Sequence, residues 1–191
     1  DQGADIVICP RVTDAAVVMG PAAWKYNWNR NDFDKLAGAL AAGHIIECGA
    51  QATGGNYSFF HEVPTFENIG YPIAEIKEDG SFYITKHENT GGLVSTGTVT
   101  AQLLYEISSP DYLNPDVISH FDTLKIEEVG KDRVYISGTK GSPPPSTHKV
   151  CMNLSGGYKN GMDLIVTGLD IPEKAKIFTD ELFRSLGGKE Q

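Results

Sequence analysis

The chain has 191 residues, of which 40% are hydrophobic, and a formal net charge of −9 from 25 acidic and 16 basic residues. A chain of this length can bury one sizeable core, so we expect a single domain. The acidic residues are spread along the chain, and such a surface repels phosphate backbones, which argues against a nucleic-acid partner.

The cysteines and the apolar runs indicate the compartment. Cys9, Cys48 and Cys151 are odd in number and far apart, so we expect buried thiols in a reducing environment and neither disulfides nor a metal site. No apolar run approaches the roughly 18 residues of a membrane-spanning helix, and no signal peptide opens the sequence. We therefore predict a cytoplasmic protein without a membrane partner.

The first predicted element is a strand. Residues 3–9 form a nearly unbroken apolar run, which is typical of a strand covered on both faces. Because such a strand needs neighbours, we expect an upstream segment of the same domain to supply them. Residues 15–24 then predict a helix interrupted at Gly20-Pro21, and residues 31–47 predict an amphipathic helix.

Two hairpins and a helix follow. Residues 71–76 and 81–85 are predicted strands around an Asp-Gly turn, and residues 122–129 pair with residues 134–136 in a second hairpin. Between the two hairpins, apolar residues at helical spacing predict a helix over 98–107.

The last part of the chain begins with a stiff proline-rich connector over 142–146. Residues 148–154 and 162–167 are predicted strands, and residues 171–186 carry the most regular helical stripe of apolar residues in the chain.

These elements indicate the α/β class. We expect a partly parallel sheet flanked by helices and a hairpin-containing α+β lobe, incomplete without an upstream segment. Residues 1–191 are treated as a single region with three portions: an α/β portion (1–56), a hairpin and glycine-loop portion (57–141) and a β-β-α portion (142–191).

Groups suited to proton transfer gather between residues 47 and 62. Glu47 and the adjacent pair His61-Glu62 are candidates for acid/base catalysis, because titratable groups held close together shift each other's pKa. The glycine-rich stretch between them would let a substrate approach the backbone, with contacts expected from Gln51, Thr53, Gly54, Gly55 and Asn56. The alternative is that Glu47 is a solvated helix end and His61-Glu62 a surface turn.

A second candidate segment precedes the helix predicted over 98–107. Unpaired amides near the start of a helix, together with a nearby lysine, suit an anionic group, and the expected contacts are Lys86, Thr90, Gly91 and Gly92. Neither a dinucleotide fingerprint nor a Walker motif is present. The alternative is a hairpin exit whose glycines only turn the chain. We expect the two double-glycine bends to converge on one cavity with free amides pointing inward.

Arg11 and Asp14 follow the first predicted strand. The carboxyl end of a strand in an open α/β sheet is where ligands usually bind, so both residues are candidate substrate contacts. The alternative is a helix cap with an ion pair. The histidine spacing does not suggest a zinc site, so no metal is expected.

A series of short stretches carries a family resemblance, found in this order: residues 3–9, 11–15, 42–51, 53–56, 70–75, 90–92, 97–106, 112–117 and 149–151. Together they resemble the acyclic terpene utilisation (AtuA-like) family, in the second half of its conserved domain. Pro10 departs from the pattern, because relatives often have a glycine-like residue there.

The resemblance implies a function in terpene catabolism, since bacterial relatives are associated with the breakdown of geraniol- or citronellol-type terpenes through acyl-CoA intermediates. Our hypothesis is a hydratase, lyase or isomerase that transfers a proton on an acyl-CoA or branched terpenoid acid. Coenzyme A would be part of the substrate, and no separate cofactor is expected.

Two other functions stay open. The first is that of a non-catalytic binding or assembly subunit. The second is that of a biosynthetic isomerase or hydrolyase of a secondary metabolite. The expected partners are a small-molecule substrate, the upstream segment or a second subunit, and further copies of the chain in a homo-oligomer.

Overall fold

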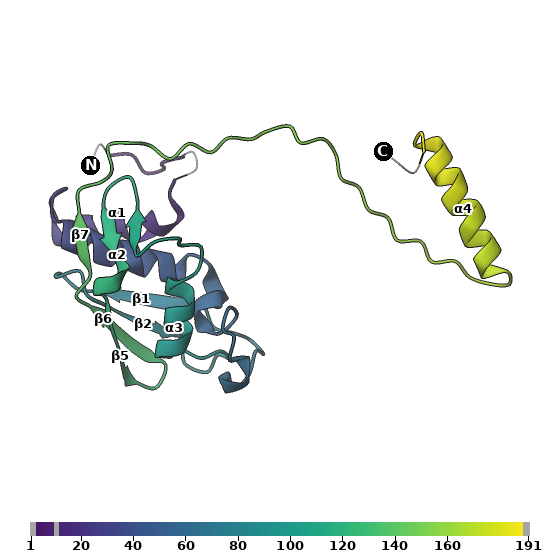
Figure 1. Cartoon of the computed structure of the whole chain (residues 1–191). Helices are drawn as coiled ribbons and strands as arrows, with labels where there is room; N and C mark the ends of the chain where they lie inside the picture. The colour runs from purple at the N-terminus through teal and green to yellow at the C-terminus, as the bar shows by residue number, and fades with distance from the viewer. Residues whose placement is uncertain (1–2, 10–11, 189–191) are drawn as a thin grey trace. The chain divides into compact units, whose positions relative to one another are not determined.

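The computed structural model describes residues 3–9 and 12–188 (Figure 1). The chain divides into two compact units, with the boundary between Lys149 and Val150. Of the elements formed by the described residues, the first unit contains both sheets and helices α1, α2 and α3, and the second contains helix α4.

Helix α2 (Phe33–Ile46) is the central element of the first unit. Residues 36–45 are all buried, so the helix is covered on every side. Its small residues let other backbone segments come close: a Cβ atom at Gly38 would collide with the carbonyl oxygen of Gly80, and one at Gly43 with that of Ala15. The helix therefore connects two hydrophobic clusters, one at each end.

A four-stranded antiparallel sheet packs against the C-terminal half of α2. It contains β1 (Pro72–Ile76), β2 (Phe82–Lys86), β6 (Arg133–Ser137) and β5 (Lys125–Gly130), in that order. Both predicted hairpins are confirmed. The first turns at Gly80, whose φ of 84° lies in the left-handed region that glycine tolerates.

A smaller sheet contacts the N-terminal half of α2. Its strands β3 (Asp111–Leu113), β4 (Ile118–His120) and β7 (Lys140–Ser142) pair antiparallel. The general α/β class is confirmed, but the parallel part of the expected sheet is not. In the part of the chain that the structure describes, parallel pairing is limited to an isolated bridge between Ile69 and Gly91.

Short helices complete the first unit. A 3-10 helix, η1 (Asp14–Val17), and helix α1 (Met19–Tyr26) pack on α2, while η2 (Gly49–Thr53) continues from its end. Helix α3 (Thr96–Leu103) begins with a capping box in which Ser95 and Thr98 exchange side-chain and backbone hydrogen bonds. Two further 3-10 helices are η3 (Phe60–Glu62) and η4 (Phe121–Thr123).

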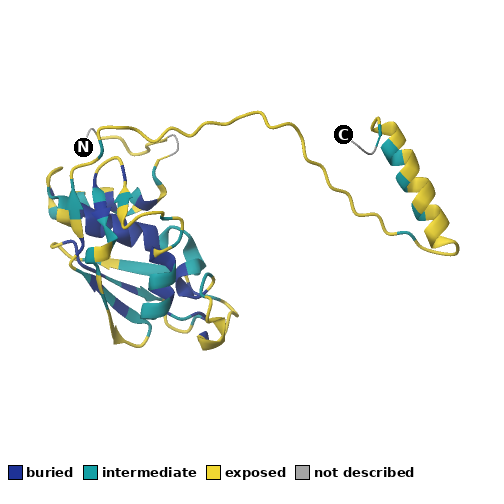
Figure 2. Cartoon of the chain, in the orientation of Figure 1, coloured by how far each residue is buried: buried dark blue, intermediate teal, exposed yellow. Residues whose placement is uncertain are grey.

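Three predicted strands are wrong. Residues 3–9, 148–154 and 162–167 form no strand, and their apolar side chains, apart from the half-buried Val166, are exposed (Figure 2); Ile8, for example, is 92% exposed. No strand among the described residues pairs with them, so nothing covers the faces that their sequences predicted to be buried. Cys9 and Cys151 are exposed for the same reason, contrary to the expected buried thiols, and Cys48 is half-buried.

The second unit consists of an extended segment and helix α4 (Ile171–Ser185), which the sequence placed correctly. Within residues 3–9 and 12–188, none of the helices combines the length and the apolar character that crossing a bilayer requires.

Candidate functional site

The C-terminal end of α2 places a carboxylate beside a thiol. Glu47 follows the last residue of the helix, and its backbone N–H donates to the carbonyl of Gly43 at 3.0 Å. The Sγ of Cys48 donates to Oε1 of Glu47 at 2.7 Å. Burial, followed by this hydrogen bond and the charge of Glu47, raises the pKa of Cys48 to about 11. At neutral pH the thiol is therefore a proton donor to the carboxylate and not a nucleophile.

His44 lies one turn before Glu47 and is only 3% exposed. Its Nε2 atom has no hydrogen-bond partner among the described residues. Burial lowers the pKa of His44, and the negative charge of Glu47 only partly opposes that effect. The ring is thus neutral near pH 7, packed against Tyr112 with 5.1 Å between ring centroids and against Phe121 with 5.8 Å.

Tyr112, on β3, brings two of the predicted site residues into one electrostatic environment. Burial raises the pKa of its phenol, and the negative charges of Asp14 and Glu47 raise it further. Asp14 begins η1, which contacts α2 through the close approach at Gly43. The charges of Asp14 and Glu47 therefore both act on one protonated phenol.

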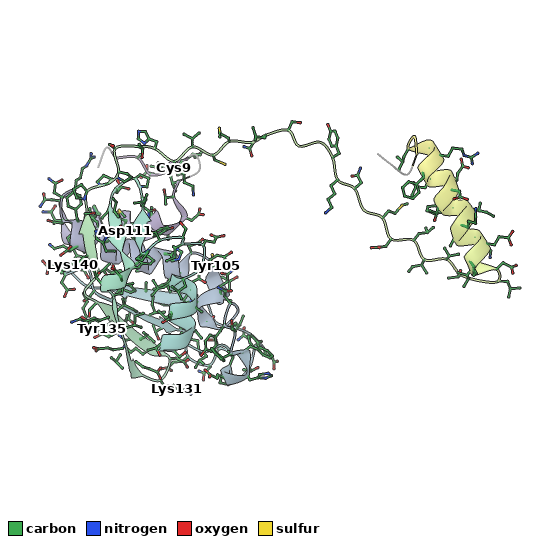
Figure 3. The ribbon with its side chains drawn as sticks, viewed as in Figure 1. Cys9, Tyr105, Asp111, Lys131, Tyr135 and Lys140 are labelled. Atoms are coloured by element: carbon green, nitrogen blue, oxygen red, sulfur yellow. The ribbon has the colours of Figure 1, made fainter. Side chains whose placement is uncertain are left out.

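Unused side-chain acceptors lie on the same side of the first unit. Oε1 of Gln51 and Oε1 of Gln102 are buried without a hydrogen-bond partner among the described residues, although buried polar atoms are normally paired. The amide nitrogen of Gln102 donates to the carbonyl of His44 at 3.5 Å. A hydrogen bond to Glu106 raises the pKa of Tyr105, labelled in Figure 3, and the side chain of Gln51 opposes this effect. We call these residues the α2-end cluster: Asp14, His44, Glu47, Cys48, Gln51, Gln102, Tyr105, Glu106 and Tyr112.

The two double-glycine bends do meet, as expected. The amide of Leu93 donates to the carbonyl of Thr53 at 2.9 Å, and the Thr53 hydroxyl donates to the carbonyl of Gly70 at 2.5 Å. The amides at the bends, however, are not free. Each of the four glycines donates a hydrogen bond from its backbone N–H to a backbone carbonyl, with N···O distances of 2.8 to 3.3 Å. These glycines are Gly54, Gly55, Gly91 and Gly92.

The glycines at these bends are explained by packing. A Cβ atom at Gly54 would lie 2.8 Å from a methyl carbon of Val63, and one at Gly92 would lie 2.7 Å from the carbonyl oxygen of Thr53. At Gly55 the distance to the Ala50 oxygen would be 2.9 Å, and at Gly91 a Cβ would collide with the Glu67 oxygen. The bends therefore bring segments of backbone together and offer no pocket of amide donors.

Lys86 is already paired inside the protein. Its side chain is 6% exposed, and Nζ lies 3.4 Å from Oδ2 of Asp132 and donates to the carbonyl of Thr90 at 2.9 Å. Thr90 donates through its hydroxyl to the carbonyl of His87. The start of α3 is also satisfied by its own capping box. This region therefore lacks the free donors on which the predicted anion site depended.

The other predicted residues are not members of the α2-end cluster or lie outside the described residues. His61 and Glu62 are exposed on η3, and Glu62 accepts a hydrogen bond from the hydroxyl of Tyr57 at 2.7 Å. The amide of Asn56 donates to the carbonyl of Gln51 at 3.2 Å. Arg11 lies outside the described residues.

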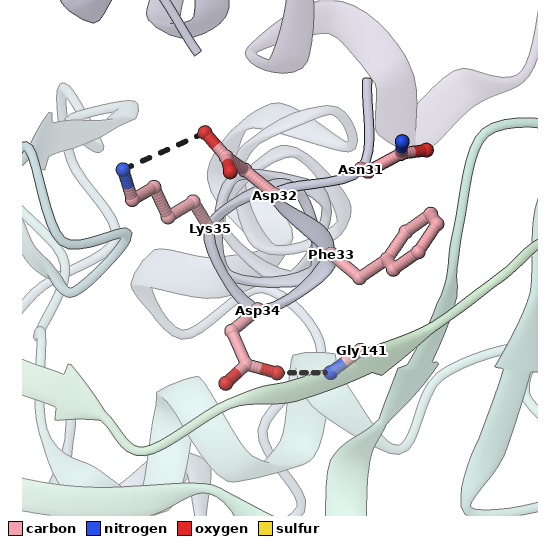
Figure 4. A pocket seen from close by; sticks show the side chains of 6 residues that line it. All are labelled: Asn31, Asp32, Phe33, Asp34, Lys35 and Gly141. Carbon is pink, nitrogen blue, oxygen red and sulfur yellow. Dashed lines mark hydrogen bonds and ion pairs between the residues drawn. The ribbon is translucent and has the colours of Figure 1, made fainter. Parts of the chain in front are cut away.

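The opposite end of α2 has an open pocket of about 320 Å³, shown in Figure 4. Asp34 accepts from the amide of Gly141 at 2.9 Å and pairs with Lys140 at 2.7 Å. Burial alone would raise the pKa of Asp34, but these hydrogen bonds lower it. The charged groups of the pocket are paired with one another, so they connect α2 to β7. None of them is placed to bind a ligand.

Several residues of the α2-end cluster were not predicted from sequence. Gln102 lies on α3, Tyr105 in the turn after it, Tyr112 on β3 and His44 on α2. These four residues converge only because the other segments pack on α2. The sequence signal that existed was His44-x-x-Glu47, which places both side chains on one side of the helix one turn apart. Within the described residues, no three His, Cys, Asp or Glu side chains are grouped as a metal site would require.

Comparison with known proteins identifies the family. Neither the curated proteins nor the solved structures gave a match. The sequence model of the acyclic terpene utilisation family protein AtuA matches residues 1–191. This match covers the whole sequence and agrees with the resemblance carried by the short stretches above, so the chain belongs to the acyclic terpene utilisation family.

Proposed function

We propose that this protein transfers a proton on an acyclic, branched acyl-CoA or the corresponding acid, as a hydratase, lyase or isomerase, with Glu47 as the base. The observation that carries the proposal is the α2-end cluster, in which the carboxylate of Glu47 is grouped with neutral donors and unpartnered acceptors. The substrate class is proposed from membership of the family.

The position of Glu47 supports a role in chemistry. A carboxylate at the C-terminal end of a helix faces the negative end of the helix dipole, which is unfavourable for stability. Among the described residues, no cation forms a salt bridge with Glu47, and its carboxylate accepts a hydrogen bond from the thiol of Cys48. An oxygen held in this way remains available to accept a proton from a substrate carbon.

The neighbouring groups would stabilise the charge that this step creates. When Glu47 takes a proton from a carbon next to a carbonyl, negative charge develops on the carbonyl oxygen. The phenol of Tyr112 and the thiol of Cys48 both stay protonated at neutral pH, because burial raises their pKa values. Either group would donate a hydrogen bond to that oxygen, while Gln51 or Gln102 would bind a polar group of the substrate.

The glycine bends and Lys86 have no part in this proposal, because their donors are satisfied within the chain. His61 and Glu62 are also left out of the acid/base roles, since both are exposed on η3 and Glu62 is hydrogen-bonded to Tyr57. A coenzyme A handle, where the substrate carries one, would bind outside the α2-end cluster, whose carboxylates repel phosphates.

Substitution of Glu47 tests the proposal. The intact protein is incubated with geranyl-CoA in deuterium oxide, and deuterium uptake into the acyl chain is followed by mass spectrometry. Glu47→Gln keeps the size of the side chain but removes the base, so we expect the rate of deuterium uptake to fall at least about 10²-fold. The matched control is Glu127→Gln on the exposed face of β5, which should leave uptake unchanged.

Two results would contradict the proposal. Undiminished deuterium uptake by Glu47→Gln would remove Glu47 from the role of base. No uptake by the wild-type protein with either geranyl-CoA or citronellyl-CoA would contradict the substrate class.

A second candidate function has its own observation. Apolar side chains of residues 5–8 and of the segment 150–169 are exposed, including Ile8, Leu154 and Ile165. Large exposed apolar stretches often mark surfaces that bind another chain. If they do so here, the protein would be a binding or assembly subunit, and Glu47→Gln would then change no chemical step while light scattering would show a stable complex.

A further inference from the structure

An open groove of about 370 Å³ runs along the outer side of α3. One wall is formed by residues 57–59, and the floor by the helix itself. The lining has no charged side chain and is largely aromatic or aliphatic, with Tyr57, Phe59, Gly97, Thr100, Ala101 and Leu104 as its main members. Its volume lies within the range of ligand pockets, about 300–1,000 Å³.

The two sides of α3 make different contacts: one packs on the core and the other lines the groove. Val99, Gln102 and Leu103 are buried against the core. Gly97, Ala101 and Leu104 lie at intervals of four and three residues, so they share the outer side. The ring of Tyr57 rests directly on this side, because a Cβ at Gly97 would lie 2.8 Å from Cζ of Tyr57. Glycine at this position lets the aromatic wall close on the helix.

The aromatic wall is held in place by Glu62. The hydroxyl of Tyr57 donates to Oε2 of Glu62 at 2.7 Å, and the ring makes an edge contact with Phe59 at 5.6 Å between centroids. Glu62 therefore acts as a positioning residue for the groove, in contrast to the acid/base role expected from its sequence.

One end of the groove approaches the α2-end cluster. Leu104, which lines the groove and is 67% exposed, immediately precedes Tyr105, whose side chain is hydrogen-bonded to that of Gln51. On the other wall, Tyr57 follows η2, the short helix that carries Gln51, and the turn between them is closed by the hydrogen bond from the amide of Asn56 to the carbonyl of Gln51. The Leu104 end of the groove is therefore the end from which a ligand would extend toward the cluster.

We infer that this groove binds the hydrocarbon chain of the substrate and directs its carbonyl end toward the α2-end cluster. The inference rests on the proposed function, which defines the end of the ligand that reacts. A neutral, elongated groove suits a flexible acyclic chain, because burial of apolar carbon is favourable and no charged group needs a partner there. A protein partner would contact about 20 or more residues, whereas the groove is lined by eight.

Filling the groove tests the inference. Ala101→Leu places a larger side chain on the floor at a helical position that leucine favours. Binding of geranic acid to the intact protein is measured by isothermal titration calorimetry, and we expect the affinity to fall at least about tenfold. Ala175→Leu on α4 is the same change in the second unit and should leave the affinity unchanged.

A second variant guards against misfolding of the first. Leu104→Ala removes apolar contact without adding volume, and should weaken geranic acid binding severalfold. As a ligand control, 3-methylbut-2-enoic acid has the same branched end but too short a chain to occupy the groove, so Ala101→Leu should hardly change its affinity. Unchanged affinity of both variants for geranic acid would overturn the inference.

The binding assay separates this inference from the proposed function. Glu47→Gln should bind geranic acid at least as tightly as the wild type, because Glu47 is not part of the groove and its charge opposes the carboxylate of the ligand. If Glu47→Gln keeps full turnover while Ala101→Leu loses binding, the proposed base is wrong and the groove stands. If Glu47→Gln loses turnover while Ala101→Leu binds normally, the base stands and the groove is wrong.

Discussion

At the scale of single residues, the pKa of the Cys48 thiol depends on the charge of Glu47. The hydrogen bond between them stabilises the protonated thiol, so removal of the carboxylate charge makes deprotonation easier. The pKa of about 11 leaves about 1% thiolate at pH 9. The reactivity of this one side chain is therefore a direct probe of the charge at Glu47.

We predict slow alkylation of Cys48 that Glu47→Gln accelerates. In iodoacetamide labelling at pH 9, followed by mass spectrometry, Cys48 should react much more slowly than the exposed Cys9 and Cys151. In Glu47→Gln, the pKa of Cys48 should fall toward its ordinary value, and labelling at pH 9 should rise severalfold. Glu127→Gln serves as the control. An identical pH profile in Glu47→Gln and wild type would show that the hydrogen bond does not set this pKa.

Part of the site could be predicted from local sequence, and the rest could not. Glu47 and Gln51 were candidates because they flank a glycine-rich turn, and Asp14 because it follows an apolar run. Tyr112 and Gln102 lie far along the chain and meet Glu47 only because their elements pack on α2. His61 and Glu62 were candidates because they are adjacent; both lie exposed on η3, where Glu62 accepts a hydrogen bond from Tyr57.

At the scale of elements, α2 depends on glycine for its tight packing. The carbonyl oxygen of Gly80 lies where a Cβ of residue 38 would be, so the first hairpin turn rests directly on the helix. In a solvent-exposed helix, replacing glycine by alanine stabilises because alanine has the higher helix propensity. In α2 the collision should reverse this sign.

We predict effects of different size for the same substitution in two helices. Gly38→Ala should lower the free energy of unfolding by about 1–3 kcal/mol, because the new methyl group overpacks the contact with Gly80. Gly20→Ala in α1, where no atom outside the adjacent residues lies within 4 Å of the added Cβ, should change it by less than about 1 kcal/mol, because the clash of a helical alanine with the following Pro21 offsets the gain in helix propensity. Urea denaturation measures both, and a stabilising Gly38→Ala would contradict the described packing.

The predicted elements were confirmed where a segment contains its own local signals, such as turn residues or helical spacing of apolar residues. The Asp-Gly turn at Gly80 and the apolar spacing in α2 and α4 were sufficient to place these elements. Residues 3–9 and 162–167 were assigned as strands from apolar character alone. A strand also needs a partner for its backbone, and a sequence pattern does not show whether that partner is present.

At the scale of the whole molecule, the boundary at Lys149 separates a packed unit from a segment with little contact of its own. Residues 150–165 are exposed throughout and form neither helix nor strand. Exposed segments without backbone pairing are the preferred sites of proteolysis. The two units should therefore differ strongly in their resistance to protease.

We predict that trypsin cuts first after Lys159. Lys159 lies in the exposed segment, whereas Lys86 has a side chain that is 6% exposed and paired with Asp132. Limited digestion followed by mass spectrometry should show a product ending at Lys159 or Lys149 while the bond after Lys86 stays intact. Equal rates of cleavage after Lys86 and Lys159 would contradict the division into two units.

The shortness of α3 has a consequence for selectivity. From Gly97 to Leu104 the helix rises only about 10 Å. Because the floor of the groove has this fixed length, the distance from the tail of a bound chain to Glu47 is set by the protein and not by the ligand. The helix would therefore select ligands by chain length. Acids with a tail shorter than this span would leave the groove partly empty, and longer ones would protrude at the Gly97 end.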